Sequence, residues 1–158
     1  MLVDIVVDAN VLMHADNPQE LRYQNSRALL QALEGCTCTV RLCVDEGFSV
    51  DEADNRSHIG SEYLKHLRFG MLGFSVVTKL AGSLRVKQVP RGVPQNVSRQ
   101  IRQVPRGPDR TYVQVAFNSH DKTLASHDFT DIPATVRRRL RGAIGVSILD
   151  AAGSLALL

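Results

Sequence analysis

The sequence predicts an α/β protein in which helices cover both faces of a central, mostly parallel sheet. Short β-branched runs alternate along the chain with longer segments of helical periodicity, an order typical of parallel sheets. The first run, residues 5–7, is uniformly apolar, as expected for a central strand buried on both faces. The 158 residues are 44% apolar. This is enough for one full-sized core, so we expect residues 1–158 to form a single domain.

The first third of the chain predicts a strand, a helix and a second strand. Residues 5–7 form the first strand, and a helix is expected to begin directly after it. Asn17 is suited to cap a helix over residues 18–35, and Gly35 is expected to end that helix in a left-handed conformation. Residues 38–44 alternate in polarity, which predicts a second strand.

The middle of the chain predicts two helices and then an unusual repeat. Residues 57–68 carry apolar side chains at helical spacing, and residues 69–84 form a second apolar helix despite its glycines. The peptide Gln-Val-Pro-Arg-Gly occupies residues 88–92 and again residues 103–107, on either side of a short helix expected around residues 97–101. Two matching turns that each present an arginine to a phosphate explain this repeat, and so does chance similarity in a polar loop.

The last third predicts two further strands, each preceded by a helix. We expect a helix over residues 109–118, a short strand over residues 122–126 and a helix over residues 131–141. Residues 143–149 predict a last buried strand, and residues 151–158 form an apolar tail. Strands and helices therefore alternate along the whole chain.

Basic side chains dominate the middle of the chain. The formal net charge is +3, but residues 63–108 contain no Asp or Glu, and residues 137–141 hold a second arginine cluster. Such separation favours a polyanionic partner held by a basic surface beside an acidic pocket, although a solvated basic face without a partner gives the same pattern. The residues that we expect to bind nucleic acid are Lys87, Arg91, Arg99 and Arg106.

Other features exclude several classes of protein. No apolar run approaches the roughly 20 residues of a membrane span, and the acidic first strand is unlike a signal peptide. Cys36, Cys38 and Cys43 lack the spacing of metal or redox motifs, so we expect reduced and mostly buried cysteines in a cytoplasmic protein. The histidines lack zinc-site spacing, and no motif supports a serine or cysteine nucleophile.

Four acidic residues occupy distinctive positions in this series of strands and helices. Asp8 ends the first strand, Glu62 lies within a predicted helix, Asp109 opens a later helix, and Asp128 follows a short strand and precedes a phenylalanine. The order of these four elements resembles the PIN-domain nucleases, and the resemblance covers nearly the whole chain.

The resemblance implies a PIN-like three-layer sandwich with the four acids at one edge of the sheet. The acids are then both metal ligands and catalytic residues for Mg²⁺- or Mn²⁺-dependent hydrolysis of phosphodiester bonds in RNA. General chemistry agrees, because carboxylates suit hard octahedral cations and crowded carboxylates without a cation repel one another. Since the family includes the toxins of toxin–antitoxin pairs, an antitoxin-type protein partner is a further expectation, as is a homodimer.

Several residues compete for the same roles. Asp131 is a rival to Asp128, although its position before an Ile-Pro pair is typical of a helix cap. Asp45 and Glu46 also follow a strand and can replace Glu62 as the second ligand.

Helix capping is a simple alternative role for two of the four acids. Asp8 at the end of the first strand and Asp109 at the start of the later helix can each cap the helix that follows. Asn10 can orient the Asp8 side chain.

Two other functions fit parts of the pattern. A PIN-like module that has lost its metal and binds RNA through a basic face is the main alternative, and the intact acids argue against it. Haloacid-dehalogenase-like phosphatases need a second Asp two residues after Asp8, where this chain has Asn10. A receiver domain needs paired acids ahead of the phosphorylated Asp, and this chain lacks them. A metal-dependent ribonuclease is therefore the function that we expect.

Overall fold

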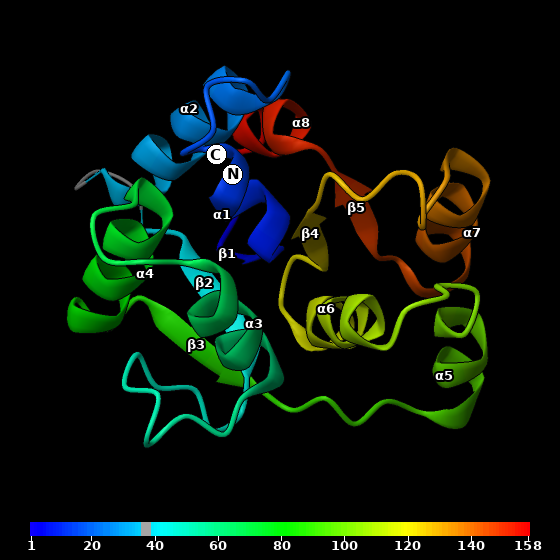
Figure 1. The fold of residues 1–158 in the computed structure, drawn as a ribbon. Coiled ribbons are helices and arrows are strands. Elements are labelled where there is room, and N and C mark those ends of the chain that lie inside the picture. Colours follow the sequence, from blue (N-terminus) through cyan, green and yellow to red (C-terminus); the bar gives the residue numbers. More distant parts are fainter. Residues whose placement is uncertain (36–38) are drawn as a thin grey trace.

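The computed structural model describes residues 1–35 and 39–158, and its centre is a sheet of parallel strands (Figure 1). All the pairings between neighbouring strands are parallel, which confirms the predicted α/β class. The strands are β1 (Asp4–Val7), β2 (Arg41–Asp45), β3 (Val86–Val89), β4 (Thr123–Ala125) and β5 (Ser147–Leu149). Their order in the sheet is β3-β2-β1-β4-β5.

The central position of β1 follows from its composition. All four of its residues are buried, and they pair with β2 on one side and with β4 on the other. The chain runs outward from β1 to β3, then returns to β4 and continues to β5. The order of strands therefore reverses between β1 and β4, and such a switch point leaves a crevice outside the carboxyl ends of the two strands.

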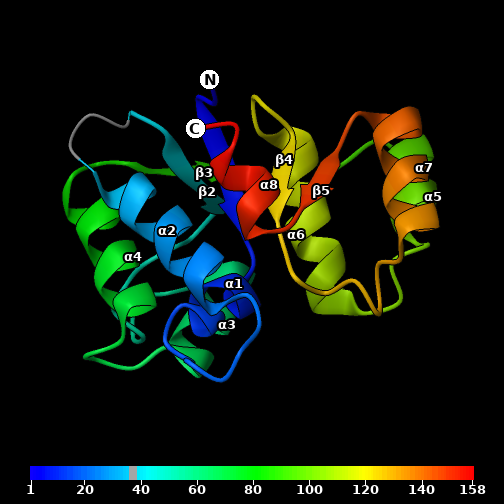
Figure 2. The same cartoon turned by 90° about the horizontal axis from the view of Figure 1, so that it is seen from above.

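Helices form a layer on each face of the sheet, as Figures 1 and 2 show. On one face, α2 packs against both α4 and α8, and α1 leads from β1 into this layer. On the other face, α6 crosses β1, β2 and β4 and packs against α3. Beyond β5, α5 and α7 lie side by side (Figure 2). The helices are α1 (Ala9–His14), α2 (Tyr23–Glu34), α3 (His58–His66), α4 (Leu72–Gly82), α5 (Gln95–Ile101), α6 (Gly107–Asn118), α7 (Ala134–Ile144) and α8 (Ala151–Leu155).

The first long helix begins later than the sequence predicts. The side chain of Asn17 accepts a hydrogen bond from the backbone N–H of Gln19 at 3.2 Å, which favours a local turn instead of a cap for a helix that starts at residue 18. The helix α2 begins at Tyr23, so Leu21 is 98% exposed instead of lying on an apolar helix face. Gly35 ends α2 with φ −52°, so the predicted left-handed cap is wrong.

The sequence pattern missed the short helix α8, which occupies part of the segment expected to be an apolar tail, and it also missed the strand β3. Its residues pair with β2, but its side chains are mostly half-buried because it lies at the edge of the sheet, and its composition is that of a polar loop. The last strand is also shorter than expected. The helix α7 continues to Ile144 and ends at Gly145, whose φ of 76° is the left-handed conformation that favours glycine. Only Ser147–Leu149 remain as β5.

Two predictions about the class of protein concern membrane spans and cysteines. Within the described residues, no helix combines the length and apolar character needed to cross a membrane. Cys43 is a buried free thiol on β2, as expected, whereas Cys36 and Cys38 lie outside the described residues.

Candidate functional site

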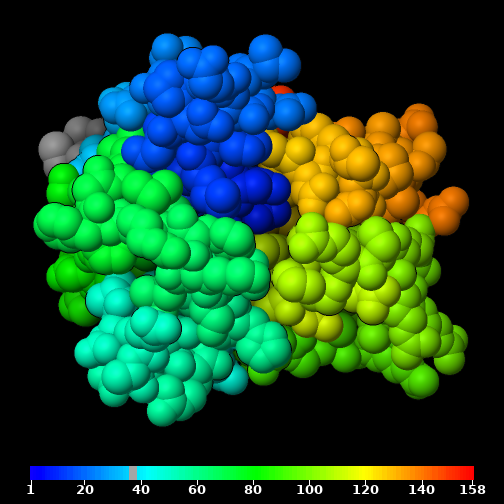
Figure 3. Space-filling model, in the orientation of Figure 1, coloured from blue at the N-terminus to red at the C-terminus, as the bar shows by residue number. Residues whose placement is uncertain are grey.

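The carboxyl ends of β1 and β4 bring three of the predicted site residues to the same crevice. Asp8 directly follows β1, and Asp128 lies in the loop after β4. Asp109 is in the first turn of α6, which packs across both strands. Figure 3 shows this face, where the dark blue segment that contains α1 meets the green segment of α3 and the yellow segments of α6 and of the loop after β4.

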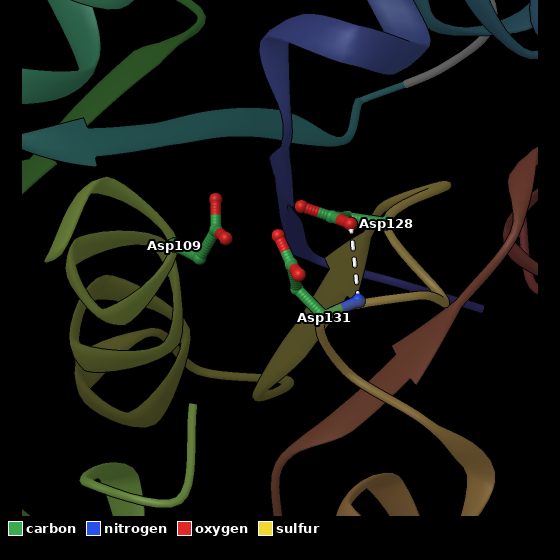
Figure 4. Close-up of side chains that lie close together, drawn as sticks. All are labelled: Asp109, Asp128 and Asp131. Carbon is green, nitrogen blue, oxygen red and sulfur yellow. Dashed lines mark hydrogen bonds between the residues drawn. The ribbon is translucent and has the colours of Figure 1, made fainter. Parts of the chain in front are cut away.

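The closest grouping of acids in the described part of the chain consists of Asp109, Asp128 and Asp131, which we call the acidic cluster. One carboxylate oxygen from each residue lies within 4.8 Å of the others. Figure 4 shows Asp109 projecting from α6 toward the loop that carries the other two acids. Within that loop, the backbone N–H of Asp131 donates to Oδ1 of Asp128 at 3.4 Å, which holds the two acids next to each other.

Asp109 is the least satisfied member of the acidic cluster. Its residue is 7% exposed, and its Oδ2 has no hydrogen-bond partner among the described residues. Burial raises the pKa of Asp109 to about 7, and the negative charges of Asp128 and Asp8 add to the effect. An ionised carboxylate without donors is costly in a buried position. This side chain therefore either carries a proton or requires a cation.

Asp8 borders the acidic cluster and is better supplied with donors. Ser126 donates its hydroxyl to Oδ2 of Asp8 at 2.8 Å, and the backbone N–H of Asn10 donates to Oδ1 at 3.2 Å. Asp8 therefore caps α1 as well as lying at the end of β1, so the two roles considered from the sequence coexist. Burial raises its pKa to about 6 even though these hydrogen bonds lower it.

Glu62 lies on α3 near Asp8 but outside the acidic cluster. Its charge contributes to the raised pKa of Asp8, so the two carboxylates face the same region. Its Oε2 lies 3.5 Å from Nε2 of His66, one helical turn further along. Glu62, a predicted site residue, is thus a neighbour of the cluster and not a member of it, and it already has His66 as a partner.

The rival acids at the end of β2, Asp45 and Glu46, lie outside the acidic cluster. Both oxygens of Asp45 accept hydrogen bonds at the start of α3, from the hydroxyl of Ser57 at 2.5 Å and from the N–H groups of His58 at 2.7 Å and Ile59 at 2.9 Å. Asp45 is fully buried by these contacts, and Glu46 is exposed. The Asp45 side chain therefore stabilises the start of α3, and Glu62 is the acid nearer to Asp8.

The interpretation of Asp131 as a helix cap is wrong. The N-cap of α7 is Pro133, and no side chain caps that helix. The Asp131 carboxylate turns instead toward Asp109, and its Oδ2 lies 3.9 Å from Nη1 of Arg106. Both rivals, Asp128 and Asp131, thus belong to the cluster.

Two histidines fix the loop that carries Asp128. Nδ1 of His127 lies 2.7 Å from Nδ1 of His14, and its Nε2 accepts from the N–H of Ala151 at 3.1 Å. The N–H of His127 donates to Oδ1 of Asn10 at 3.1 Å. His127 is buried in this loop, and burial lowers its pKa to about 4. A neutral imidazole accounts for these contacts, since Nε2 acts as an acceptor.

The four cations expected to bind nucleic acid do not form one surface. Lys87 extends from β3 to the buried Asp4, at 2.8 Å, so it serves the opposite edge of the sheet and not the cluster. Arg99 is exposed on α5. Arg106 approaches Asp131, and Arg91 lies near the start of α3. Of the four cations, the two arginines of the Val-Pro-Arg-Gly segments are therefore near the acidic site. Arg106 lies near an acid of the cluster, and Arg91 lies near the helix α3, which carries Glu62.

The two copies of that peptide adopt different structures. In the first copy, Val89 is the last residue of β3 and Gly92 lies in the following loop. In the second copy, Arg106 is the N-cap of α6 and Gly107 is its first residue. The idea of two matching turns is therefore wrong.

Comparison of the chain with protein-family models, with curated proteins and with solved structures finds no match in any of the three.

Proposed function

We propose that the protein is a metal-dependent endoribonuclease with a PIN-like site, in which Mg²⁺ or Mn²⁺ binds at the acidic cluster. The observation that carries this proposal is the buried Oδ2 of Asp109, which has no hydrogen-bond partner among residues 1–35 and 39–158 and lies in a group of three carboxylates. Without a cation, this arrangement leaves a raised pKa and an unsatisfied acceptor in the protein interior. A divalent cation supplies what the group lacks.

The residues fit such an ion. All the available donors are carboxylate oxygens, which suit Mg²⁺ and Mn²⁺ better than zinc. Asp109, Asp128 and Asp131 would hold the ion, and Asp8 and Glu62 add negative charge beside them. When bound, the ion would polarise a phosphoryl oxygen and lower the pKa of water.

The protein's own groups position the acids for this chemistry. Ser126 and Asn10 fix the orientation of the Asp8 carboxylate, and the His14–His127 pair fixes the loop after β4. Asp8, whose pKa is raised to about 6, is suited to accept a proton from an attacking water near neutral pH. The exposed guanidinium of Arg106 offers a positive charge to a phosphate beside Asp131.

RNA is the substrate that we propose, in the cytoplasm, with cleavage within the strand. The alternative is a PIN-like RNA-binding module without activity. Such a module would keep three crowded carboxylates, one of them with an unpaired oxygen, without gaining from them. An antitoxin-type partner and a homodimer remain predictions of the family resemblance.

A cleavage assay tests the proposal. Purified protein is incubated with structured and single-stranded RNA in Mn²⁺, Mg²⁺ or EDTA. We expect cleavage that needs the metal and that falls by about 100-fold or more in Asp109→Asn and Asp8→Asn. Asp54→Asn is the matched control, because Asp54 is exposed in the loop after β2. RNA binding without cleavage in either metal would contradict the nuclease proposal and favour the binding module.

A further inference from the structure

A pocket of about 480 Å³ lies between α3 and α6, and its walls include Gly107 and Pro108, which directly precede Asp109 of the acidic cluster. Its walls also include His58 and Glu62 from α3, Thr111 and Tyr112 from α6, and Arg91 from the segment after β3. Its volume is within the range of about 300–1,000 Å³ that is usual for small-molecule sites. Glu62 is close enough to Asp8 for its charge to raise the pKa of that residue, so the Glu62 side of the pocket lies toward the acids of the proposed active site.

Arg91 is held in a fixed orientation at the pocket. Its Nε lies 3.4 Å from the buried Oδ2 of Asp45, and its Nη1 lies 2.9 Å from Nε2 of His58. Asp45 is itself fixed by the start of α3, so the guanidinium rests on a rigid base. Among the described residues, Nη2 has no hydrogen-bond partner. A guanidinium held from one side, with donors left over, is prepared to bind a phosphate with little loss of side-chain entropy.

The charges of the pocket define which ligand it suits. Glu62 brings a negative charge to the pocket, and Arg91 brings a positive charge that the buried Asp45 partly offsets. A phosphate is attracted to the Arg91 end and repelled by the metal-free acids. When the phosphate of a nucleotide binds Arg91, the neighbouring part of the RNA chain therefore extends toward the acidic cluster.

We propose that this pocket is a subsite for one nucleotide of a single-stranded RNA, with the phosphate on Arg91, beside the bond that is cleaved at the acidic cluster. This inference rests on the proposed function and adds the substrate class. A base in an RNA duplex must break its base pair before it can enter the pocket between α3 and α6. An unstacked base in a single strand can enter without this cost.

The experiment measures binding without catalysis. A fluorescein-labelled hexauridylate with a free 5′-hydroxyl is titrated with protein in EDTA, and fluorescence anisotropy gives Kd. We expect Arg91→Gln to weaken binding by about tenfold and to flatten the slope of log affinity against log salt by about 0.7. Arg41→Gln is the matched control, because Arg41 is exposed at the opposite end of β2 and we expect no change.

A second variant guards against loss of folding, since Arg91→Gln removes a partner of the buried Asp45. Gly107 lines the pocket, and a Cβ on it would meet no described atom within 4 Å. Gly107→Phe should therefore fold, fill the pocket and weaken binding as strongly as Arg91→Gln. Gly142→Phe on α7, where a Cβ likewise meets no described atom within 4 Å, is its control.

The outcomes separate this inference from the proposed function. Loss of binding in Arg91→Gln and Gly107→Phe but not in their controls supports the subsite, whether or not the wild type cleaves RNA. Unchanged binding in Gly107→Phe overturns the subsite even if metal-dependent cleavage is present. Equal competition by a tetraglutamate peptide and by unlabelled hexauridylate also overturns it, because the pocket would then suit an acidic protein segment.

Discussion

The two ends of β1 each carry a buried aspartate, and the two differ in their donors. Asp4 is fully buried. Its carboxylate accepts hydrogen bonds from Nζ of Lys87 at 2.8 Å and from the backbone N–H groups of His120 and Asp121, each at 3.0 Å. Burial alone would raise the pKa of Asp4, but these donors lower it below its usual value. At the carboxyl end, burial raises the pKa of Asp8 to about 6 and that of Asp109 beside it to about 7.

The difference shows which buried acids are structural and which are available for a ligand. Asp4 has more than one donor for its charge, so its interactions are complete within the protein. Asp109 has an oxygen without a partner among the described residues, and other carboxylates lie around it. Perturbed pKa values with unmet hydrogen bonds are typical of functional sites. The predictions below test this contrast, starting with the largest expected effect.

Asp4→Asn should lower the free energy of unfolding by about 2–4 kcal/mol, because it removes the buried charge that pairs with Lys87 and replaces one acceptor oxygen by an NH2 group, which then faces the backbone N–H of either His120 or Asp121. Urea denaturation followed by circular dichroism measures the change. A loss below about 1 kcal/mol would show that the interactions of Asp4 are not structural.

Asp109→Asn should have the opposite sign without metal. The amide removes a charge from a repelling group and can donate to Asp128, so we expect a gain of about 1–2 kcal/mol at neutral pH in EDTA. The same urea experiment applies. A clear loss of stability would mean that the Asp109 carboxylate is needed for the fold.

The gain from Asp109→Asn should depend on pH. The pKa of Asp109 is raised above its unfolded value, so in the wild type this group costs stability as pH rises from about 4 to about 7. The advantage of the variant should therefore be small near pH 5 and about 2–3 kcal/mol larger near pH 8. The lowered pKa values of His14 and His127 make stability depend on pH in the opposite direction. This contribution is present in both proteins, so it cancels when the wild type and the variant are compared. An advantage that does not change with pH would mean that Asp109 does not titrate in this range.

Arg106→Gln should have the smallest effect on stability. Its contact with Asp131 is at 3.9 Å, and its side chain is 63% exposed, so we expect a change within about 0.5 kcal/mol. Thermal unfolding in EDTA is sufficient to measure it. A loss of several kcal/mol would show that the second Val-Pro-Arg-Gly segment is structural.

The sequence predicted the fold and part of the site because local signals were strong. Asp8 and Asp109 are each fixed by an element that the pattern predicts, the apolar strand β1 and the amphipathic helix α6. Asp131 was interpreted wrongly because the direction of its carboxylate depends on the loop after β4. That loop is held by the His14–His127 pair, a contact between residues 113 positions apart. The edge strand β3 was missed because half-buried polar residues give no apolar run.

The central claim is that Asp109 and its neighbours hold a divalent cation, and a thermal shift with Mn²⁺ tests it most directly. A saturating ion at a hundredfold excess over its Kd stabilises the wild type by about 2.7 kcal/mol, or about 5–10 °C for a chain of this length. We predict that the Asp54→Asn control keeps this rise and that Asp109→Asn, although at least as stable without metal, loses it. An equal rise in Asp109→Asn and in the wild type would contradict the claim.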